Sequence, residues 1–230
     1  MQIEARFASL RGGLIVSCQA PIDSPLNEPH VISAMALAAE QQGAIGVRLN
    51  GPANIAAARA RIQVPIIGIE KVVMPGSDVY ITPTFAVAER VVQSGVDILA
   101  LDATQRPRPN GENIAELIAR IRAELATPVM ADIATFDEGL RAADCGADII
   151  ATTLCGYTKE TEGASLPAFD LLERLATNIK LPIICEGGVA APDELRRAFD
   201  CGAFAVVVGT AITGITQLVQ NFVRATPRSQ

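Results

Sequence analysis

The chain has 230 residues, of which 50% are hydrophobic and only 4% aromatic, so aliphatic side chains must fill its interior. Its 19 basic and 25 acidic residues give a net charge of −6, and the basic residues are scattered. This pattern argues against a nucleic-acid partner, which needs a basic patch. No apolar run reaches the roughly 20 residues that span a bilayer, and the sequence MQIEARFASLRGG at the start lacks the apolar core of a signal peptide. We therefore expect no membrane partner and a cytoplasmic location.

Eight short apolar runs are bounded by turn residues and separated by alanine-rich stretches of helical periodicity, which predicts alternating strands and helices. The runs cover residues 14–17, 44–49, 66–69, 98–102, 129–132, 149–152, 183–186 and 205–208. Each run is nearly continuous in apolar residues, which is typical of a strand buried on both faces of a parallel sheet.

The residues that precede these runs alternate between glycine and proline. Gly43, Gly95, Gly146 and Gly202 precede the even-numbered runs, where glycine supplies the left-handed end of a helix. Pro65, Pro128 and Pro182 precede the third, fifth and seventh runs, where proline bars helix continuation. The repeat unit is therefore βαβα. Four such units closing into a ring predict an α/β fold, the (β/α)8 TIM barrel.

We expect residues 1–230 to form a single TIM-barrel domain with a frayed tail over residues 225–230. The alternative is an open, doubly wound α/β sheet. The GxGxxG fingerprint of dinucleotide-binding sheets is missing after the first run, where the sequence reads SCQAP, and this disfavours the alternative.

The cysteine pattern predicts reduced, buried thiols rather than disulfides or metal ligands. The five cysteines have no CxxC spacing and are Cys18, Cys145, Cys155, Cys185 and Cys201. Cys18 and Cys155 adjoin the expected pocket, so an oxidation-sensitive role is the alternative for them. His30, the only histidine, has no partner at ligand spacing, so we expect neither a zinc site nor a Ser-His-Asp triad and place it in a surface loop.

A polar residue stands at or near the end of nearly every predicted strand, where the active sites of these barrels lie. These residues are Gln19, Arg48, Lys71, Asp102, Asp132, Thr153 and Glu186. Each buried charge needs a partner, so a barrel built only for stability has little reason to carry so many charges at its strand ends. The pattern therefore predicts a functional pocket.

The turns after the seventh and eighth strands are rich in glycine. Glu186-Gly187-Gly188 follows the seventh strand and Gly209-Thr210-Ala211 follows the eighth. Backbone amides in such turns, together with a short helix, form the common phosphate site of these barrels. We predict phosphate-binding loops after strands 7 and 8, with Gly187, Gly188, Gly209 and Thr210 as the binding residues. The alternative is that these turns need glycine for geometry alone.

Nine segments together resemble the N-acetylmannosamine-6-phosphate 2-epimerases of bacterial sialic acid catabolism. They are GGLIVSCQA (12–20), GVRLNG (46–51), PIIGIEK (65–71), YITPT (80–84), LDATQRPRP (101–109), MADIATFDEG (130–139), TTLCGYT (152–158), CEGG (185–188) and VVVGTAIT (206–213). The resemblance implies an isomerase that interconverts N-acetylmannosamine 6-phosphate and N-acetylglucosamine 6-phosphate at C2, acting as a homodimer. No metal or organic cofactor is implied, because the sequence has no ligand cluster or nucleotide fingerprint.

The resemblance also assigns roles to residues. It implies that Lys71 and Glu186 are the catalytic pair. Substrate-binding roles are expected for Gln19, Arg48, Asp132, Thr153 and Tyr157, and for Asp102 and Arg106, which belong to the LDATQRPRP segment and order the mouth of the site.

The sequence departs from the family pattern around the expected phosphate. Gly188 and Gly214 stand where basic residues are usual, and Val72 and Val73 replace a basic-acidic pair. The alternatives are therefore an epimerase of a non-phosphorylated or differently charged amino sugar, or a catalytically silent barrel that binds a sugar phosphate. A metal-dependent pentulose-phosphate epimerase is disfavoured, because one histidine cannot supply its metal site.

The third and seventh strands of such a barrel face each other, so Lys71 and Glu186 would approach the reacting carbon from different sides. Lys71 acts as a base only if its pKa falls, which burial and Arg48 favour and Asp102 or Asp132 oppose. The sequence leaves open which effect wins and which residue removes the proton. The alternative for the pair is a buried salt bridge across the mouth.

Overall fold

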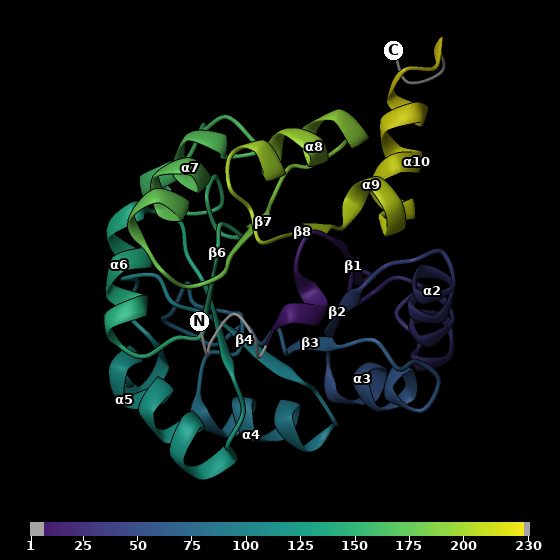
Figure 1. Cartoon of the computed structure of the whole chain (residues 1–230). Helices are drawn as coiled ribbons and strands as arrows, with labels where there is room; N and C mark the ends of the chain where they lie inside the picture. Colours follow the sequence, from purple (N-terminus) through teal and green to yellow (C-terminus); the bar gives the residue numbers. More distant parts are fainter. Residues whose placement is uncertain (1–6, 228–230) are drawn as a thin grey trace.

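The computed structural model describes residues 7–227 and shows parallel strands closed into a ring, with helices around the outside (Figure 1). The strands follow one another in chain order, and the last pairs with the first. They are β1 (Leu14–Cys18), β2 (Gly46–Asn50), β3 (Ile66–Ile69), β4 (Ile98–Asp102), β5 (Val129–Asp132), β6 (Ile149–Ala151), β7 (Ile183–Glu186) and β8 (Ala205–Val208). The predicted (β/α)8 barrel is confirmed, and the alternative of an open sheet is wrong.

The helices that connect the strands cover the outer face of the ring (Figure 1). They are α2 (Pro29–Gln41), α3 (Pro52–Arg59), α4 (Phe85–Gln93), α5 (Ile114–Arg120), α6 (Phe136–Asp144), α7 (Phe169–Asn178) and α8 (Pro192–Asp200), followed after β8 by α9 (Thr210–Thr213) and α10 (Ile215–Arg224). Shorter turns are η1 (Ala8–Leu10), η2 (Pro109–Gly111), η3 (Ile121–Leu125) and η4 (Lys159–Thr161).

Every predicted strand is observed, and the predicted bounds differ from the observed ones by at most two residues. The predictions for β3, β4, β5, β7 and β8 match the observed bounds, β1 extends one residue further and β6 ends one residue earlier. The second strand begins at Gly46 rather than at Ala44, because the Ala44 amide still donates to the carbonyl of Ala39 in α2 at 3.0 Å.

The glycines ahead of the even-numbered strands have the left-handed conformation that was predicted. Their φ values are 92° for Gly43, 97° for Gly95, 89° for Gly146 and 91° for Gly202. Each glycine follows a helix that would otherwise continue past the start of the next strand, so these residues set the lengths of the helices around the ring.

Alternate residues of each strand face opposite sides of the sheet. Ile67 and Ile69 of β3 belong to the cluster that fills the barrel interior, whereas Ile66 packs in the outer cluster beneath the helices. Phe7 and Phe204, which precede β1 and β8, extend the interior cluster at the end where the strands begin. The interior is therefore apolar at the end where the strands begin, and its polar side chains lie at the opposite end.

All five cysteines are free thiols, as predicted. Cys18, Cys155 and Cys185 are also buried as predicted, whereas Cys145 and Cys201 are only partly buried. Burial raises the pKa of Cys18 to about 12 and also raises that of Cys155. A reactive cysteine needs a lowered pKa, so the oxidation-sensitive alternative is not supported for either residue. Cys18 belongs to the outer cluster, so it packs beneath the helices rather than beside the barrel interior.

The placement of His30 in a loop is wrong. His30 is exposed, as expected of a surface residue, but it is the second residue of α2. Pro29 precedes it at the first helical position, where the fixed φ of proline starts a helix rather than ending one.

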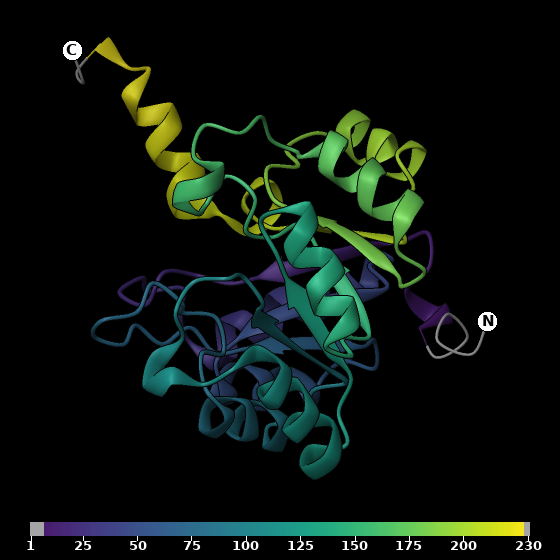
Figure 2. The ribbon, with the colours of Figure 1, turned by 90° about the vertical axis from the view of Figure 1, so that its left-hand side faces the viewer.

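The chain leaves the ring through α9 and α10, and α10 points away from the barrel in both Figure 1 and Figure 2. No residue of α10 is buried. Of the expected frayed tail, Thr226 donates through its amide and its hydroxyl to the Val223 carbonyl, and residues 228–230 lie outside the described residues. No helix within residues 7–227 is long and apolar enough to cross a membrane.

Candidate active site

Strand periodicity brings the predicted acidic residues to the interior of the barrel. Asp102, Asp132 and Glu186 each follow, by two positions, an apolar residue of the interior cluster. Residues two apart on a strand face the same side, so these carboxylates continue the interior columns at the ends of β4, β5 and β7. Asp102 and Asp132 are also direct neighbours across the paired strands β4 and β5.

The guanidinium of Arg48 is the centre of the site. Its Nη1 and Nη2 donate to the two carboxylate oxygens of Asp132 at 3.0 and 2.6 Å, and Nη1 also donates to Glu186 Oε2 at 2.7 Å. The side chains of Arg48 and Asp132 are 1% and 0% exposed. Burial lowers the pKa of Arg48, but the two carboxylates outweigh burial and raise it, so the arginine stays charged. One cation therefore holds β2, β5 and β7 together.

Glu186 is a carboxyl group with a strongly raised pKa. The pKa is raised to about 7, with burial as the largest cause and the negative charge of Asp132 acting in the same direction. Arg48, the hydroxyl of Thr153 and Lys71 act in the opposite direction. The Glu186 side chain keeps 13% of its surface exposed. Near neutral pH this group can therefore hold or release a proton, which is what general acid–base chemistry requires.

Lys71 lies two residues beyond the end of β3, on the opposite side of the ring from β7. Its amide donates to Asn50 Oδ1 at 2.9 Å, and its backbone pairs with Ile81 in an isolated antiparallel bridge. Within residues 7–227, no hydrogen bond or ion pair holds its ammonium group. Glu186 is paired with Arg48 instead, so the alternative of a Lys71–Glu186 salt bridge is not observed.

The pKa of Lys71 is lowered, so burial and Arg48 outweigh the carboxylates at this exposed residue. The side chain keeps contact with solvent, but protein around it removes part of its hydration, and this burial is the largest cause of the shift. The charge of Arg48 lowers the pKa further, while Glu186 and Asp132 raise it. Asp102, which was also expected to raise it, pairs with Arg106.

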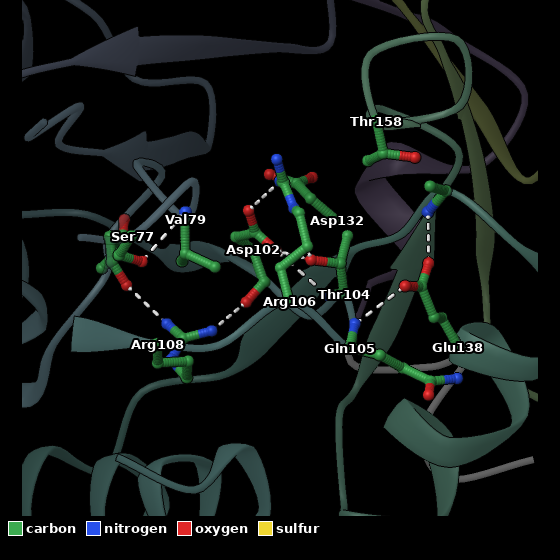
Figure 3. Close-up of polar contacts among 12 residues, drawn as sticks. Ser77, Val79, Asp102, Thr104, Gln105, Arg106, Arg108, Asp132, Glu138 and Thr158 are labelled. Atoms are coloured by element: carbon green, nitrogen blue, oxygen red, sulfur yellow. Dashed lines mark hydrogen bonds and ion pairs between the residues drawn. The ribbon is translucent and has the colours of Figure 1, made fainter. Parts of the chain in front are cut away.

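The segment after β4 is held by its own polar residues (Figure 3). Arg106 Nη2 donates to Asp102 Oδ2 at 2.5 Å, and the Thr104 hydroxyl donates to Asp102 Oδ1 at 2.7 Å. Burial raises the pKa of Asp102, and the bonds from Thr104 and the charge of Arg106 oppose this increase. Glu138 of α6 accepts the Gln105 amide at 2.8 Å. The segment is thus tied to a strand and to a helix at the rim.

Tyr80 is a further site residue, and it does not stand at the end of a predicted strand. Its carbonyl accepts the Val72 amide at 2.9 Å, and its ring packs against the interior cluster. Burial raises the pKa of its phenol, which interacts electrostatically with Arg106, Asp102, Asp132 and Arg48. Tyr80 lies in a loop that folds back over the mouth, so position relative to a strand could not identify it. The YITPT segment was the available signal.

Gln19 and Tyr157 approach the glycine-rich turns from two sides. Gln19 donates through Nε2 to Ser17 Oγ at 3.0 Å, while its Oε1 is buried and accepts no hydrogen bond from the described part of the chain. A Cβ atom at Gly209 would lie 3.6 Å from Ser17 Oγ. Tyr157 is 57% exposed, and its ring would lie 3.9 Å from a Cβ at Gly187. Within residues 7–227, the side chain of Arg48 bonds to Asp132 and Glu186 and to neither of these two residues.

The turns after β7 and β8 present free amides. Gly187 and Gly188 have φ values of 111° and 77°, and Gly209 precedes the short helix α9. Among residues 7–227, no backbone acceptor bonds the amides of Gly188 and Thr210. Because β7 and β8 are paired neighbours, these two turns lie at the same part of the rim.

Gly188 and Gly214 are packed too closely for a side chain. A Cβ atom at position 188 would lie 2.4 Å from Leu166 Cβ, and one at position 214 would lie 2.7 Å from the Cα of Thr210. A basic residue at either position therefore requires a shift of the neighbouring backbone. The local packing therefore accounts for glycine at both positions of this chain.

Among the described residues, no three His, Cys, Asp or Glu side chains are grouped so that they could hold a metal ion. The side chains of the mouth that can gain or lose a proton and have a shifted pKa include Lys71, Tyr80, Asp102 and Glu186. The closed barrel and its opposed amine and carboxyl group define an enzyme of the (β/α)8 class with a site suited to acid–base chemistry.

The chain belongs to the N-acetylmannosamine-6-phosphate 2-epimerase family, as the resemblance predicted. The family model described as "Putative N-acetylmannosamine-6-phosphate epimerase" matches residues 32–228. A relative of that designation from Synechococcus elongatus is 51% identical over 227 residues, 98% of each chain, and one from Cutibacterium acnes is 46% identical over 94% of each chain. The solved structure of the N-acetylmannosamine-6-phosphate 2-epimerase from Clostridium perfringens, 41% identical, matches with a TM-score of 0.91 over 95% of each chain.

Replacing Arg48 with Met should destabilise the fold, because the buried Asp132 and Glu186 lose their shared cation. We expect the free energy of unfolding in urea to fall by about 3 to 5 kcal/mol at pH 8. The loss should be smaller at pH 5, since Glu186, with its raised pKa, is then protonated and its ionisation no longer has to be compensated.

Arg196→Met is the matched control, because Arg196 forms an exposed ion pair with Asp193. Exposed pairs contribute about 1 kcal/mol or less, so this variant should unfold almost like the wild type at both pH values. Equal, small losses for the two variants would show that the Arg48 network does not hold the barrel together.

Proposed function

We propose that this protein interconverts N-acetylmannosamine 6-phosphate and N-acetylglucosamine 6-phosphate by removing and returning the proton at C2. The observation that carries the proposal is the placement of Lys71 just beyond β3 and of Glu186 at the end of β7, on opposite sides of a closed ring. Inversion at a carbon needs one group on each face of that carbon. The names of the relatives support the same reaction for this chain.

The chemistry requires C1 of the sugar to be a carbonyl, because only then is the neighbouring C2 hydrogen acidic. One of the two residues takes the C2 proton, the electron pair of the broken C–H bond forms a C1–C2 double bond, and the π pair of the carbonyl moves onto the C1 oxygen until C2 is protonated again. The other residue then delivers a proton to the opposite face of C2. Each transfer lies within the capacity of a positioned amine or carboxyl group.

The shifted pKa values suit a reaction that runs in both directions. Lys71 has a lowered pKa and Glu186 a pKa of about 7, so the two groups titrate closer together than a free amine and a free carboxyl group. In one direction the base is the amine and the acid is the carboxyl group, and in the other direction the roles are exchanged. We propose that the pair carries its protons in this alternating way.

The other mouth residues are proposed to bind the sugar. The unpartnered Gln19 Oε1 suits a substrate hydroxyl, and the exposed ring of Tyr157 offers a stacking surface. Arg106, held by Asp102, supplies positive charge at the rim. Arg48 and Asp132 bond mainly to each other, so we assign them the positioning of Glu186 and the stabilisation of charge on the C1 oxygen. Both proton transfers are carried by side chains, so the proposal includes no cofactor.

The phosphate group is proposed to bind the backbone amides of Gly187, Gly188, Gly209 and Thr210. The free amides of Gly188 and Thr210 support this assignment. Leu166 and Thr210 occupy the space that basic side chains at positions 188 and 214 would need, so backbone donors replace side-chain charge here.

We further propose that the enzyme is a homodimer and works in the cytoplasm. The dimer is supported by an apolar stripe on α10, where Ile215, Val219, Phe222 and Val223 are 49 to 78% exposed. Such a stripe on a helix that projects from the barrel suits contact with a second copy. The five free cysteines are consistent with a reducing compartment.

Lys71→Ala and Glu186→Gln should each abolish epimerisation at C2, because each variant lacks one of the two proton carriers that act on opposite faces of this carbon. We expect losses of about a hundredfold or more, measured by NMR of N-acetylmannosamine 6-phosphate in deuterium oxide. Lys180→Ala is the control, since Lys180 is exposed and precedes β7 at the far end of the ring. Epimerisation at the wild-type rate in both site variants would contradict the assignment of the pair.

The phosphate should improve turnover even though it is bound without basic side chains. We expect kcat/KM for N-acetylmannosamine 6-phosphate to exceed that for N-acetylmannosamine by about ten- to a hundredfold, the range of one charge-assisted hydrogen bond. Equal values would favour the alternative of a non-phosphorylated substrate. Binding of both sugars without turnover would favour a silent barrel.

Phe222→Glu should convert the dimer into a monomer, because it places a charge in the centre of the apolar stripe of α10. Sedimentation velocity should give the mass of two chains for the wild type and of one chain for the variant. Gln220→Glu, which adds the same charge on the same helix outside the stripe, should remain dimeric. A monomeric wild type would refute this part of the proposal.

A further inference from the structure

Two consecutive threonines follow β6 and contact Glu186 on the neighbouring strand. The Thr152 hydroxyl donates to the Glu186 carbonyl at 2.9 Å and accepts the Glu186 amide at 3.0 Å. Thr152 is 1% exposed, so these bonds are sheltered from water. The backbone of Glu186 is therefore fixed from β6, and its side chain alone remains to be placed.

The hydroxyl of Thr153 lies between two carboxylates. It is 2.7 Å from Asp132 Oδ1 and 3.2 Å from Glu186 Oε2. A hydroxyl has one proton to donate, and both neighbours are acceptors when ionised. The hydroxyl proton of Thr153 is thus donated to a carboxylate of the protein and is not available to a substrate. This disfavours the expectation that Thr153 binds the substrate directly.

The two oxygens of Glu186 have different surroundings. Oε2 accepts from Arg48 at 2.7 Å and contacts the Thr153 hydroxyl. Within residues 7–227, Oε1 has no hydrogen-bond partner. One oxygen is anchored and the other is free, and only a free oxygen can approach a substrate carbon.

We propose that Thr153 is a positioning residue: it holds Oε2 of Glu186 so that Oε1 is the oxygen that exchanges a proton with the sugar. This role rests on the function proposed above. Arg48 anchors the same oxygen, but a guanidinium bonded to two carboxylates can follow either of them. The Thr153 contact fixes the separation of Glu186 from Asp132 and so restricts the rotation of the carboxyl group.

The charges that face Glu186 are those of Arg48, Asp132 and Lys71. The hydrogen bond from Thr153 lowers the pKa of Glu186, against the larger increase caused by burial. Without that bond the ionised form loses a donor, and the pKa of Glu186 rises further above about 7. Thr153 therefore affects both the direction and the protonation of this carboxyl group.

Thr153→Val tests the proposal, with Thr153→Ser as the variant that retains the hydroxyl. The first measurement needs no substrate: the carboxyl signal of Glu186 is titrated by infrared difference spectroscopy and identified by its loss in Glu186→Gln. We expect the pKa to rise by about one unit or more in Thr153→Val and to stay at the wild-type value in Thr153→Ser. Thr104→Val, which removes a threonine–carboxylate bond at Asp102, should leave the Glu186 titration unchanged.

The second measurement is the pH profile of C2 hydrogen exchange. Thr153→Val should lower kcat by about tenfold or more and shift the limb that belongs to Glu186 upward, with KM changed by less than about twofold. Raised KM with an unchanged Glu186 titration would overturn the proposal and make Thr153 a substrate ligand. Absence of exchange in the wild type would refute the proposed function instead, while the substrate-free titration would still test the role of Thr153.

Discussion

The buried contact of Arg48 with Asp132 and Glu186 is the interaction on which the site depends. Three charges lie in a place where an unpaired charge is costly, and each is tolerated only because the others are present. The contact joins β2, β5 and β7, no two of which are neighbours in the ring. A change in barrel closure would therefore move the carboxylates relative to the arginine. The geometry of the site and the closure of the ring are coupled.

The barrel could be predicted from the sequence because the same pattern of residue types recurs in each βαβα repeat. Apolar runs, left-handed glycines and strand-entry prolines recur, so errors at single residues do not change the fold. His30 shows the limit of this approach, since Pro29 begins a helix where a loop was expected. The boundaries of the elements depend on single hydrogen bonds, such as the one from the Ala44 amide to the Ala39 carbonyl of α2. A pattern of residue types does not reveal such bonds.

The candidate site was predictable where its residues follow strands and not where they lie in loops. Arg48, Asp132 and Glu186 could be predicted because strand parity places them on one interior surface. Tyr80 could not, because its position depends on how the segment after β3 folds back against Val72. The direction of the Lys71 pKa also required coordinates, since burial and charges of both signs compete around it.

A single physical cause gives the two proposed proton carriers their complementary properties. Burial penalises charge of either sign, so it lowers the pKa of the amine of Lys71 and raises that of the carboxyl group of Glu186. Arg48 lowers both values, which keeps Glu186 from becoming too weak an acid while it further favours a neutral Lys71. The pKa values of the two groups, which would differ widely in water, thus become more similar. A reaction whose substrate and product differ only in the configuration of one carbon benefits from this, because neither direction then requires a strongly unfavourable proton transfer.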